Sequence, residues 1–256
     1  MPLSFANKPG LVVYLTAGDP SLEATYDIAL AAIDSGAQVI ELGVPFSDPL
    51  ADGPVIQRAS ERAVGRGVTL TDVLALSNSI REARPACGII LFSYLNPVVR
   101  MGLPTFCAVA KANGADGVLL TDMIVEEATE YLAEMRKNDL APVFLAAPTS
   151  PDERLKAIAE NSRGFVYAIS RVGITGTQDQ VAGDAEQLVK RLKQFTDLPI
   201  AVGFGISRAE HVQSVMQFAD AAIVGSAIVS LIEQSKAGEE AQAVGDFVHG
   251  LTAAGK

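Results

Sequence analysis

Tryptophan is absent from this chain of 256 residues, and aromatic residues of all kinds make up only 6% of it. Hydrophobic residues nevertheless reach 49%, so the core must be built mainly from aliphatic side chains. Small and β-branched residues are typical of parallel strands that are buried on both faces. The chain length suits a single α/β barrel and is long for most other folds with one core.

Basic residues are also scarce. The chain has 20 Lys and Arg residues against 30 Asp and Glu residues, which gives a formal net charge of −10. This balance argues against a nucleic-acid partner, which needs basic patches, and against an anionic membrane surface. It still permits a small anionic substrate, because backbone N–H groups bind phosphate without lysine.

Long apolar runs are missing as well. No stretch reaches the roughly 18 uncharged apolar residues that a membrane span needs, and no signal peptide is visible at the N-terminus. The two cysteines, Cys87 and Cys107, have neither metal-binding nor redox spacing. We therefore expect a cytoplasmic protein with no disulfide and no metal site.

Short apolar runs, in contrast, recur regularly and are separated by amphipathic stretches. Each run is continuous rather than alternating, as expected for strands covered on both faces. The eight predicted strands are residues 11–16, 38–42, 88–92, 117–120, 142–145, 165–169, 199–202 and 221–224. In the predicted helix at 21–35, one face carries Leu22, Tyr26, Ala29, Leu30 and Ile33.

The alternation of strand and helix predicts an α/β fold with a parallel sheet. Eight such units favour a closed (β/α)8 TIM barrel, with residues 1–256 forming a single domain. An open doubly wound sheet is the alternative. Ser207 and Glu210 have the spacing of a capping box, which predicts a helix start there. An extra short helix is expected at 227–233, after the eighth strand.

The carboxyl ends of the barrel strands, where catalytic groups lie in this fold, carry carboxylates and tyrosines. No Lys or Cys lies at a predicted strand end, and the histidines His211 and His249 fall on predicted helices. A Schiff-base lysine, a histidine base or a histidine metal site is therefore not expected. Carboxylates and tyrosine remain for proton transfer.

Two carboxylates stand out. Glu41 lies inside an apolar strand, where desolvation raises the pKa of a carboxyl toward the range useful for acid–base catalysis. Pairing with a structural partner explains such a position equally well. Asp52 follows in a loop rich in Gly and Pro, where an Asx-turn or a helix N-cap is the more frequent role. An Asx-turn or a helix N-cap is also the alternative role for Asp48 and Asp19.

Two further segments suggest binding of an anion. Gly205 follows the seventh predicted strand, and Gly225 and Ser226 follow the eighth. Barrels often bind phosphate with these two loops and the N-terminus of a short helix, through backbone N–H groups and the helix dipole. The segment 171–183, rich in Gly and Thr, is predicted to be either a lid over the substrate or an ordinary mobile loop.

Together these motifs resemble the tryptophan synthase α subunit family. The matching segments are residues 14–20, 41–54, 94–97, 147–149, 170–176 and 203–207, which follow the family's order and span nearly the whole chain. The segment that starts at Glu41 is the most specific of them. One departure is visible after Asp122, where the family usually has an apolar residue and then Pro, and this chain has Met123 and Ile124.

The resemblance implies a carbon–carbon lyase of tryptophan biosynthesis. Its reaction is the reversible retro-aldol cleavage of indole-3-glycerol phosphate to indole and glyceraldehyde 3-phosphate. Glu41 is implied as the proton shuttle and Asp52 as the acceptor of the indole N–H, with no metal and no cofactor in this chain. The implied substrate-binding residues are Tyr14, Tyr167, Thr175, Gly176, Gly205, Gly225 and Ser226.

The resemblance also implies a partner. In this family an α2β2 tetramer is expected, in which indole passes through a tunnel to a β subunit that carries pyridoxal phosphate. The loops after strands two and six would form the contact. The alternatives are a stand-alone lyase that releases indole, a non-catalytic barrel that only binds a partner, and a phosphate-binding isomerase barrel.

Overall fold

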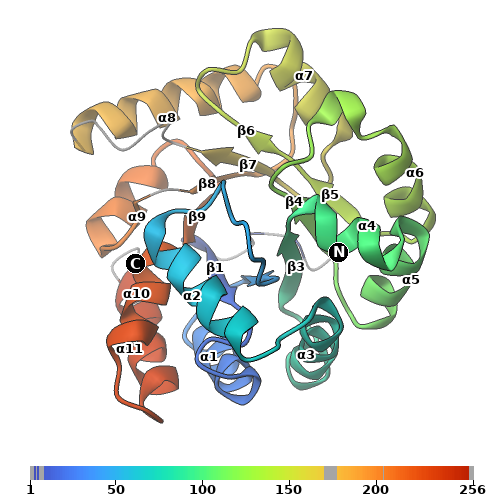
Figure 1. Cartoon of the computed structure of the whole chain (residues 1–256). Helices are drawn as coiled ribbons and strands as arrows, with labels where there is room; N and C mark the ends of the chain where they lie inside the picture. The colour runs from blue at the N-terminus through green and yellow to red at the C-terminus, as the bar shows by residue number, and fades with distance from the viewer. Residues whose placement is uncertain (1–2, 4, 6–8, 170–177, 204, 254–256) are drawn as a thin grey trace.

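The computed structural model describes residues 3, 5, 9–169, 178–203 and 205–253. Within these residues nine parallel strands form one sheet, in the order β5-β4-β3-β2-β1-β9-β8-β7-β6, and helices surround the sheet (Figure 1). The strands are β1 (Gly10–Thr16), β2 (Val39–Gly43), β3 (Gly88–Ser93), β4 (Gly117–Leu120), β5 (Ala141–Val143), β6 (Leu145–Ala146), β7 (Val166–Ile169), β8 (Ile200–Gly203) and β9 (Ala221–Val224).

The first strand, β1, pairs with both β2 and the last strand, β9, so the two ends of the strand order are β5 and β6, which are consecutive segments of the chain. The fifth predicted strand, residues 142–145, changes partner at Phe144. Before it, β5 pairs with β4, and after it β6 pairs with β7. The Tyr167 N–H donates to the Phe144 carbonyl at 3.2 Å, which continues the ladder across the interruption. The predicted barrel is confirmed with its fifth strand divided, and the open doubly wound sheet is excluded.

The helices follow the strands in the expected alternation. They are α1 (Leu22–Asp34), α2 (Pro54–Gly65), α3 (Leu70–Ala83), α4 (Leu95–Met101), α5 (Leu103–Ala112), η1 (Val125–Glu127), α6 (Thr129–Lys137), α7 (Asp152–Asn161), α8 (Gln178–Leu192), α9 (Ala209–Val215), α10 (Ser226–Gln234) and α11 (Glu240–Ala253). Helix α10 is the extra short helix predicted after the last strand. His211 lies on α9 and His249 on α11, as predicted.

Side-chain caps begin some of these helices. Ser21 Oγ accepts from the Ala24 N–H at 3.0 Å at the start of α1. The capping box predicted from Ser207 and Glu210 is wrong, because α9 starts later, its N-cap is Arg208, and no side chain caps it. The Ser207 N–H instead donates to His211 Nδ1 at 3.3 Å.

The buried face of α1 also differs from the prediction. Its buried residues are Thr25, Ile28, Ala29 and Ala32, and of the predicted face only Ala29 is among them. Helix α1 packs against α3 and α11 as well as against strands. The other four predicted residues are partly buried, three of them against the main core. A helix with neighbours on both flanks therefore spreads its apolar residues over a broad stripe, with small residues at its centre.

The strands contribute to two hydrophobic layers. Side chains such as Leu11, Ile40 and Leu91 belong to the core between strands and helices. The residues that alternate with them along the strands, such as Val12 and Val39, form a separate cluster inside the barrel. This alternation follows from the two-residue period of a strand, and it places every second residue inside the barrel.

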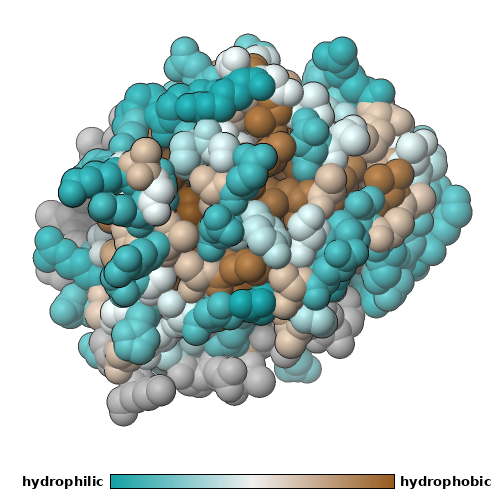
Figure 2. All heavy atoms as spheres, turned by 90° about the horizontal axis from the view of Figure 1, so that it is seen from below, coloured by the Kyte–Doolittle hydropathy of each residue, from teal (hydrophilic) through white to brown (hydrophobic). Residues whose placement is uncertain are grey.

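The face of the molecule that carries α1 and α3 is mostly polar (Figure 2). Figure 2 views the molecule from the side that is lowest in Figure 1, where α1 and α3 lie, and hydrophilic residues dominate this face while apolar residues show in its hollows. In the part of the chain that the structure describes, none of the helices has the length and apolarity needed to cross a membrane.

Candidate active site

Glu41 is a completely buried carboxyl inside the barrel. It lies on β2 two residues after Val39, which belongs to the cluster inside the barrel, so both side chains point inward. Its exposed fraction is 0%, and neither carboxyl oxygen has a hydrogen-bond partner among the described residues. Burial raises the pKa of Glu41 to about 8. The group is therefore largely protonated at neutral pH, as a general acid must be.

Two tyrosines lie near Glu41. Tyr14 is its register partner on β1, and Tyr167 lies on β7. The pKa of both phenols is raised well above the ordinary value, mainly by burial, and the charge of Glu41 contributes. Gly43 and Gly203 make room for them, because a Cβ at Gly43 would collide with the Tyr14 hydroxyl and one at Gly203 would lie 2.5 Å from the Tyr167 hydroxyl.

An apolar wall surrounds Tyr14. Its ring meets Phe92 edge-on at a centroid distance of 5.1 Å. Val55 and Ile56 of α2 and Val229 of α10 belong to the same hydrophobic cluster. The wall offers a flat aromatic molecule the edge-to-face and apolar contacts that such rings prefer. The polar groups here are few, as in most small-molecule sites.

Asp52 lies at the end of the long loop between β2 and α2. Tyr94 Oη donates to Asp52 Oδ2 at 2.9 Å. Burial raises the pKa of Asp52 to about 6, and the hydrogen bond from Tyr94 opposes that shift. Helix α2 has Gly53 as its N-cap and no side-chain cap, so Asp52 does not act as the cap that its sequence position suggested.

The two carboxyls have different environments and therefore different protonation. Glu41, with a pKa of about 8, carries its proton at neutral pH, whereas Asp52, with a pKa of about 6, is mostly ionised. The ionised form of either carboxyl raises the pKa of the Tyr14 phenol, with Asp52 the larger contributor, so both groups act on the same small region. A pair of carboxyls whose pKa values are pushed apart is typical of a site with one acid and one anionic stabiliser.

The predicted phosphate residues lie at the ends of neighbouring strands. Gly203 of β8 pairs with Ile223 of β9, so the loops that follow these strands start side by side. Gly205 has a φ of +68°, which favours glycine. Gly225 is the N-cap of α10 and Ser226 its first residue. Loop and helix N–H groups in this arrangement suit an anion.

The predicted lid is only partly described. Helix α8 begins at Gln178, so residues 178–183 are helical and were wrongly assigned to a loop. Thr175 and Gly176, which are predicted substrate contacts, lie outside the described residues.

Asp19 has a structural role instead. It is 4% exposed and receives two hydrogen bonds from Arg62, at 2.8 and 2.6 Å. Arg62 also contacts Glu233 at 2.7 Å, and Arg58 contacts Glu233 at 2.8 Å. This network ties the loop after β1 and helix α2, which follows Asp52, to α10, which carries the predicted phosphate loop at its start.

Large apolar side chains are exposed at the carboxyl end of the barrel. Leu50 is 91% exposed in the loop after β2, Val99 is 60% exposed on α4 after β3, and Ile124 is 45% exposed after β4. Ile124 is one of the two residues that depart from the family pattern. Leu50 lies in the loop after strand two, where the resemblance implied a partner contact, whereas sequence reasoning missed Val99.

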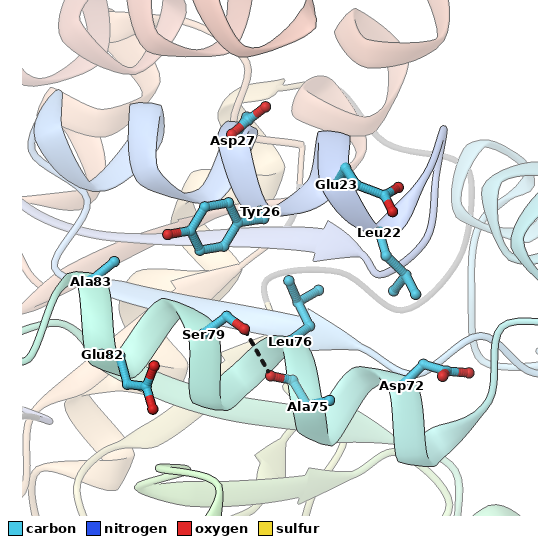
Figure 3. A pocket seen from close by; sticks show the side chains of 10 residues that line it. All are labelled: Leu22, Glu23, Tyr26, Asp27, Asp72, Ala75, Leu76, Ser79, Glu82 and Ala83. Atoms are coloured by element: carbon cyan, nitrogen blue, oxygen red, sulfur yellow. Dashed lines mark hydrogen bonds between the residues drawn. The ribbon is translucent and has the colours of Figure 1, made fainter.

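A groove of about 740 Å³ lies elsewhere, on the outside of the barrel between α1 and α3 (Figure 3). Its lining is acidic and apolar and includes none of the predicted site residues. The lining residues are Leu22, Glu23, Tyr26, Asp27, Asp72, Ala75, Leu76, Ser79, Glu82 and Ala83.

Comparison with known proteins identifies the family of this chain. A family model described as tryptophan synthase alpha chain matches residues 3–251. The tryptophan synthase alpha chain of Solibacter usitatus is 51% identical over 229 residues, which cover 90% of this chain and 85% of that one. The alpha chain of Polynucleobacter asymbioticus is 42% identical over 246 residues, 96% of this chain and 93% of that one.

Solved structures give the same result. A chain of the tryptophan synthase α2β2 complex of Pyrococcus furiosus superposes with a TM-score of 0.89 at 40% identity, and the match covers 95% of this chain and 98% of that one. A chain of tryptophan synthase from Mycobacterium tuberculosis gives a TM-score of 0.88 at 37% identity, with 96% and 92% covered.

Proposed function

We propose the following function from the premise that this chain belongs to the tryptophan synthase alpha chain family, whose members are the indole-generating lyase subunit of that enzyme. The chain cleaves indole-3-glycerol phosphate to indole and glyceraldehyde 3-phosphate. The observation that carries the proposal is the pair of carboxyls with opposite protonation, protonated Glu41 inside the barrel and ionised Asp52 in the loop after β2, beside an apolar wall.

Glu41 moves the protons. Its carboxylic acid donates a proton to C3 of the indole ring, which turns C3 into a tetrahedral carbon and leaves a positive charge on the ring nitrogen. The resulting carboxylate then takes the proton from the hydroxyl on the adjacent glycerol carbon. That oxygen forms a carbonyl, the carbon–carbon bond breaks, and its electron pair restores the indole ring. Glu41 ends protonated, ready for another turnover.

Asp52 stabilises the charge. The carboxylate accepts the indole N–H and lies opposite the positive charge that develops on that nitrogen during the reaction. A fixed anion in a partly desolvated site lowers the energy of such an intermediate more than water does. Tyr14, Tyr167 and Phe92 would enclose the ring, while Gly205, Gly225 and Ser226, with Thr175 and Gly176, would hold the phosphate.

The partner in this proposal is a tryptophan synthase β subunit in an α2β2 tetramer in the cytoplasm. The exposed apolar side chains of Leu50, Val99 and Ile124 at the carboxyl end support a docking surface there, because a large apolar residue in water is stabilised by burial in an interface. Pyridoxal phosphate belongs to the partner, since no described lysine of this chain lies at the carboxyl end of a strand.

The test is direct. The purified chain is mixed with indole-3-glycerol phosphate, with and without a β subunit, and indole is measured. Indole release that rises strongly with the β subunit is expected. Equal rates with and without it would favour a stand-alone lyase. Glu41→Gln keeps the shape of the side chain and removes its acid, so turnover should fall by about a hundredfold to ten-thousandfold; wild-type turnover in this variant would refute the mechanism.

A further inference from the structure

The hydroxyl of Tyr94 is a fixed point at the mouth of the barrel. Tyr94 is the N-cap of α4, and the next N–H, that of Leu95, donates to Asp122 Oδ1 at 2.7 Å. The Tyr94 side chain is only 5% exposed, and its ring packs against Phe46 at a centroid distance of 5.1 Å. Backbone and ring are thus both held, which fixes the position of the hydroxyl between the side chains of Asp52 and Thr121, both of which share a hydrogen bond with it.

The neighbours of this hydroxyl decide which hydrogen bond it accepts and which it donates. The Ala51 N–H donates to Tyr94 Oη at 2.9 Å, and Tyr94 Oη lies 2.9 Å from Asp52 Oδ2. An N–H can only donate, so it occupies an acceptor position of the phenol oxygen, whereas an ionised carboxylate can only accept. The Thr121 hydroxyl is a neutral third partner, and its bond lowers the pKa of the phenol, as a donor to the phenol oxygen does. The phenol proton therefore points to the anionic Asp52.

One carboxylate oxygen of Asp52 thus accepts a hydrogen bond from a described residue, and the other does not. Oδ2 is bound by Tyr94, while no described residue donates to Oδ1. We propose that Tyr94 is a positioning residue for the lyase reaction: its hydroxyl anchors Asp52 through Oδ2 and so leaves Oδ1 turned to the substrate N–H. This inference rests on the proposed function, because it gives Asp52 the role of N–H acceptor.

Tyr94→Phe tests the inference, because it removes the hydroxyl and keeps the ring. A hydrogen bond to a charged group accounts for about a 10- to 100-fold effect. We expect kcat to fall by about this factor with a smaller change in KM, since the charge on the nitrogen develops only after binding. The acid limb of the pH profile should also move to higher pH, because the hydrogen bond lowers the pKa of Asp52.

Other groups around Asp52 do not obscure that readout. The titratable side chains whose electrostatics include Asp52 are the phenols of Tyr14, Tyr94 and Tyr167, whose pKa values are raised above the ordinary value of 10.0. They stay protonated across the acid limb. Glu41 is the carboxyl of the same site, and its pKa of about 8 belongs to the alkaline limb.

Tyr131→Phe is a matched control. Tyr131 is 2% exposed, and its hydroxyl donates to the Val118 carbonyl at 2.9 Å, away from both carboxyls. It should lower the stability of the protein and leave the pH profile unchanged. If Tyr94→Phe behaves like this control, or keeps wild-type kcat and acid limb, the inference is overturned.

Asp52→Asn separates this inference from the proposed function. If Asp52→Asn keeps a reduced but measurable rate, Tyr94→Phe added to it should have little further effect, because the two changes remove one interaction. An additive loss in the double variant would overturn the positioning role alone. Full indole release by Asp52→Asn would overturn the proposed role of Asp52 and the inference with it.

Discussion

Tyr14 and Glu41 are register partners on the neighbouring strands β1 and β2, and the Tyr14 ring packs in one hydrophobic cluster with residues of α2 and α10. The neighbours of Glu41 are thus aromatic or aliphatic, and no described residue bonds to its carboxyl oxygens. This burial explains why the carboxyl keeps its proton at neutral pH.

The pH dependence of kcat/KM should be bell-shaped. Asp52 must be ionised and Glu41 protonated, so the rate should rise as Asp52 loses its proton near pH 6 and fall as Glu41 loses its own near pH 8. Initial rates of indole release between pH 5 and pH 9.5 check this. A rate that stays flat up to the highest pH would show that the protonated form of Glu41 is not needed.

Glu41→Gln should make the protein more stable at alkaline pH. The pKa of Glu41 is about 8 in the folded chain against an ordinary value of 4.5, so between these values the native state keeps a proton that the unfolded chain releases. The free energy of unfolding of the wild type therefore falls as pH rises through this window, by at most about 5 kcal/mol from this group. The Gln side chain does not ionise, so Glu41→Gln does not lose stability in this way.

Urea unfolding of both proteins at pH 5 and pH 8.5 measures the difference. The gap in favour of Glu41→Gln should widen with pH, whereas Glu210→Gln, a change on the exposed surface of α9, should give a constant gap. Parallel curves for wild type and Glu41→Gln would mean that the carboxyl is paired or hydrated in solution.

Much of this site followed from local sequence. Glu41 was detectable because a carboxylate interrupts an apolar run, and Gly225 because it follows the last strand. Tyr94 was visible as part of a motif but not as a partner of Asp52, because that hydrogen bond spans 42 residues and depends on how the loop before α2 folds.

The errors also have physical causes. The change of partner at Phe144 depends on both neighbouring strands, and a local apolar run contains no information about them. Ser207 is of a residue type that often caps helices, but its N–H donates to His211 Nδ1, and α9 begins only at Ala209. Local chemistry predicts which residues are able to cap or pair, while tertiary contacts decide which of them do.

Leu50→Asp should weaken binding of the β subunit without changing the fold. Leu50 is 91% exposed, so it contributes little to the core, and a carboxylate there would have to be desolvated in an interface. We expect at least about a tenfold loss of affinity, measured as the concentration of β subunit that gives half-maximal indole release. Val64→Asp, at the far end of α2, is the control; equal effects of the two changes would place the interface elsewhere.

Arg62→Ala should destabilise the protein and also impair the site. Asp19 is buried with Arg62 as its bidentate partner, so removal of the guanidinium leaves a buried charge with only the 4.0 Å contact from Arg66. A loss of about 2 kcal/mol in the free energy of unfolding is expected, less than for a fully buried pair because Arg62 is partly exposed.

Arg58→Ala is the matched change, because Arg58 bonds Glu233 but not Asp19, and it should alter the stability little. Arg62 joins α2, which follows Asp52, to α10, whose first turn is the proposed phosphate site, so KM should rise in Arg62→Ala and stay near wild type in Arg58→Ala. A double-mutant cycle of Arg62→Ala with Asp19→Asn isolates the pair, and a coupling energy near zero would show that Asp19 is stabilised by other groups. A large coupling energy with unchanged KM would make the network a support for the fold alone, separate from the positions of Asp52 and the phosphate loop.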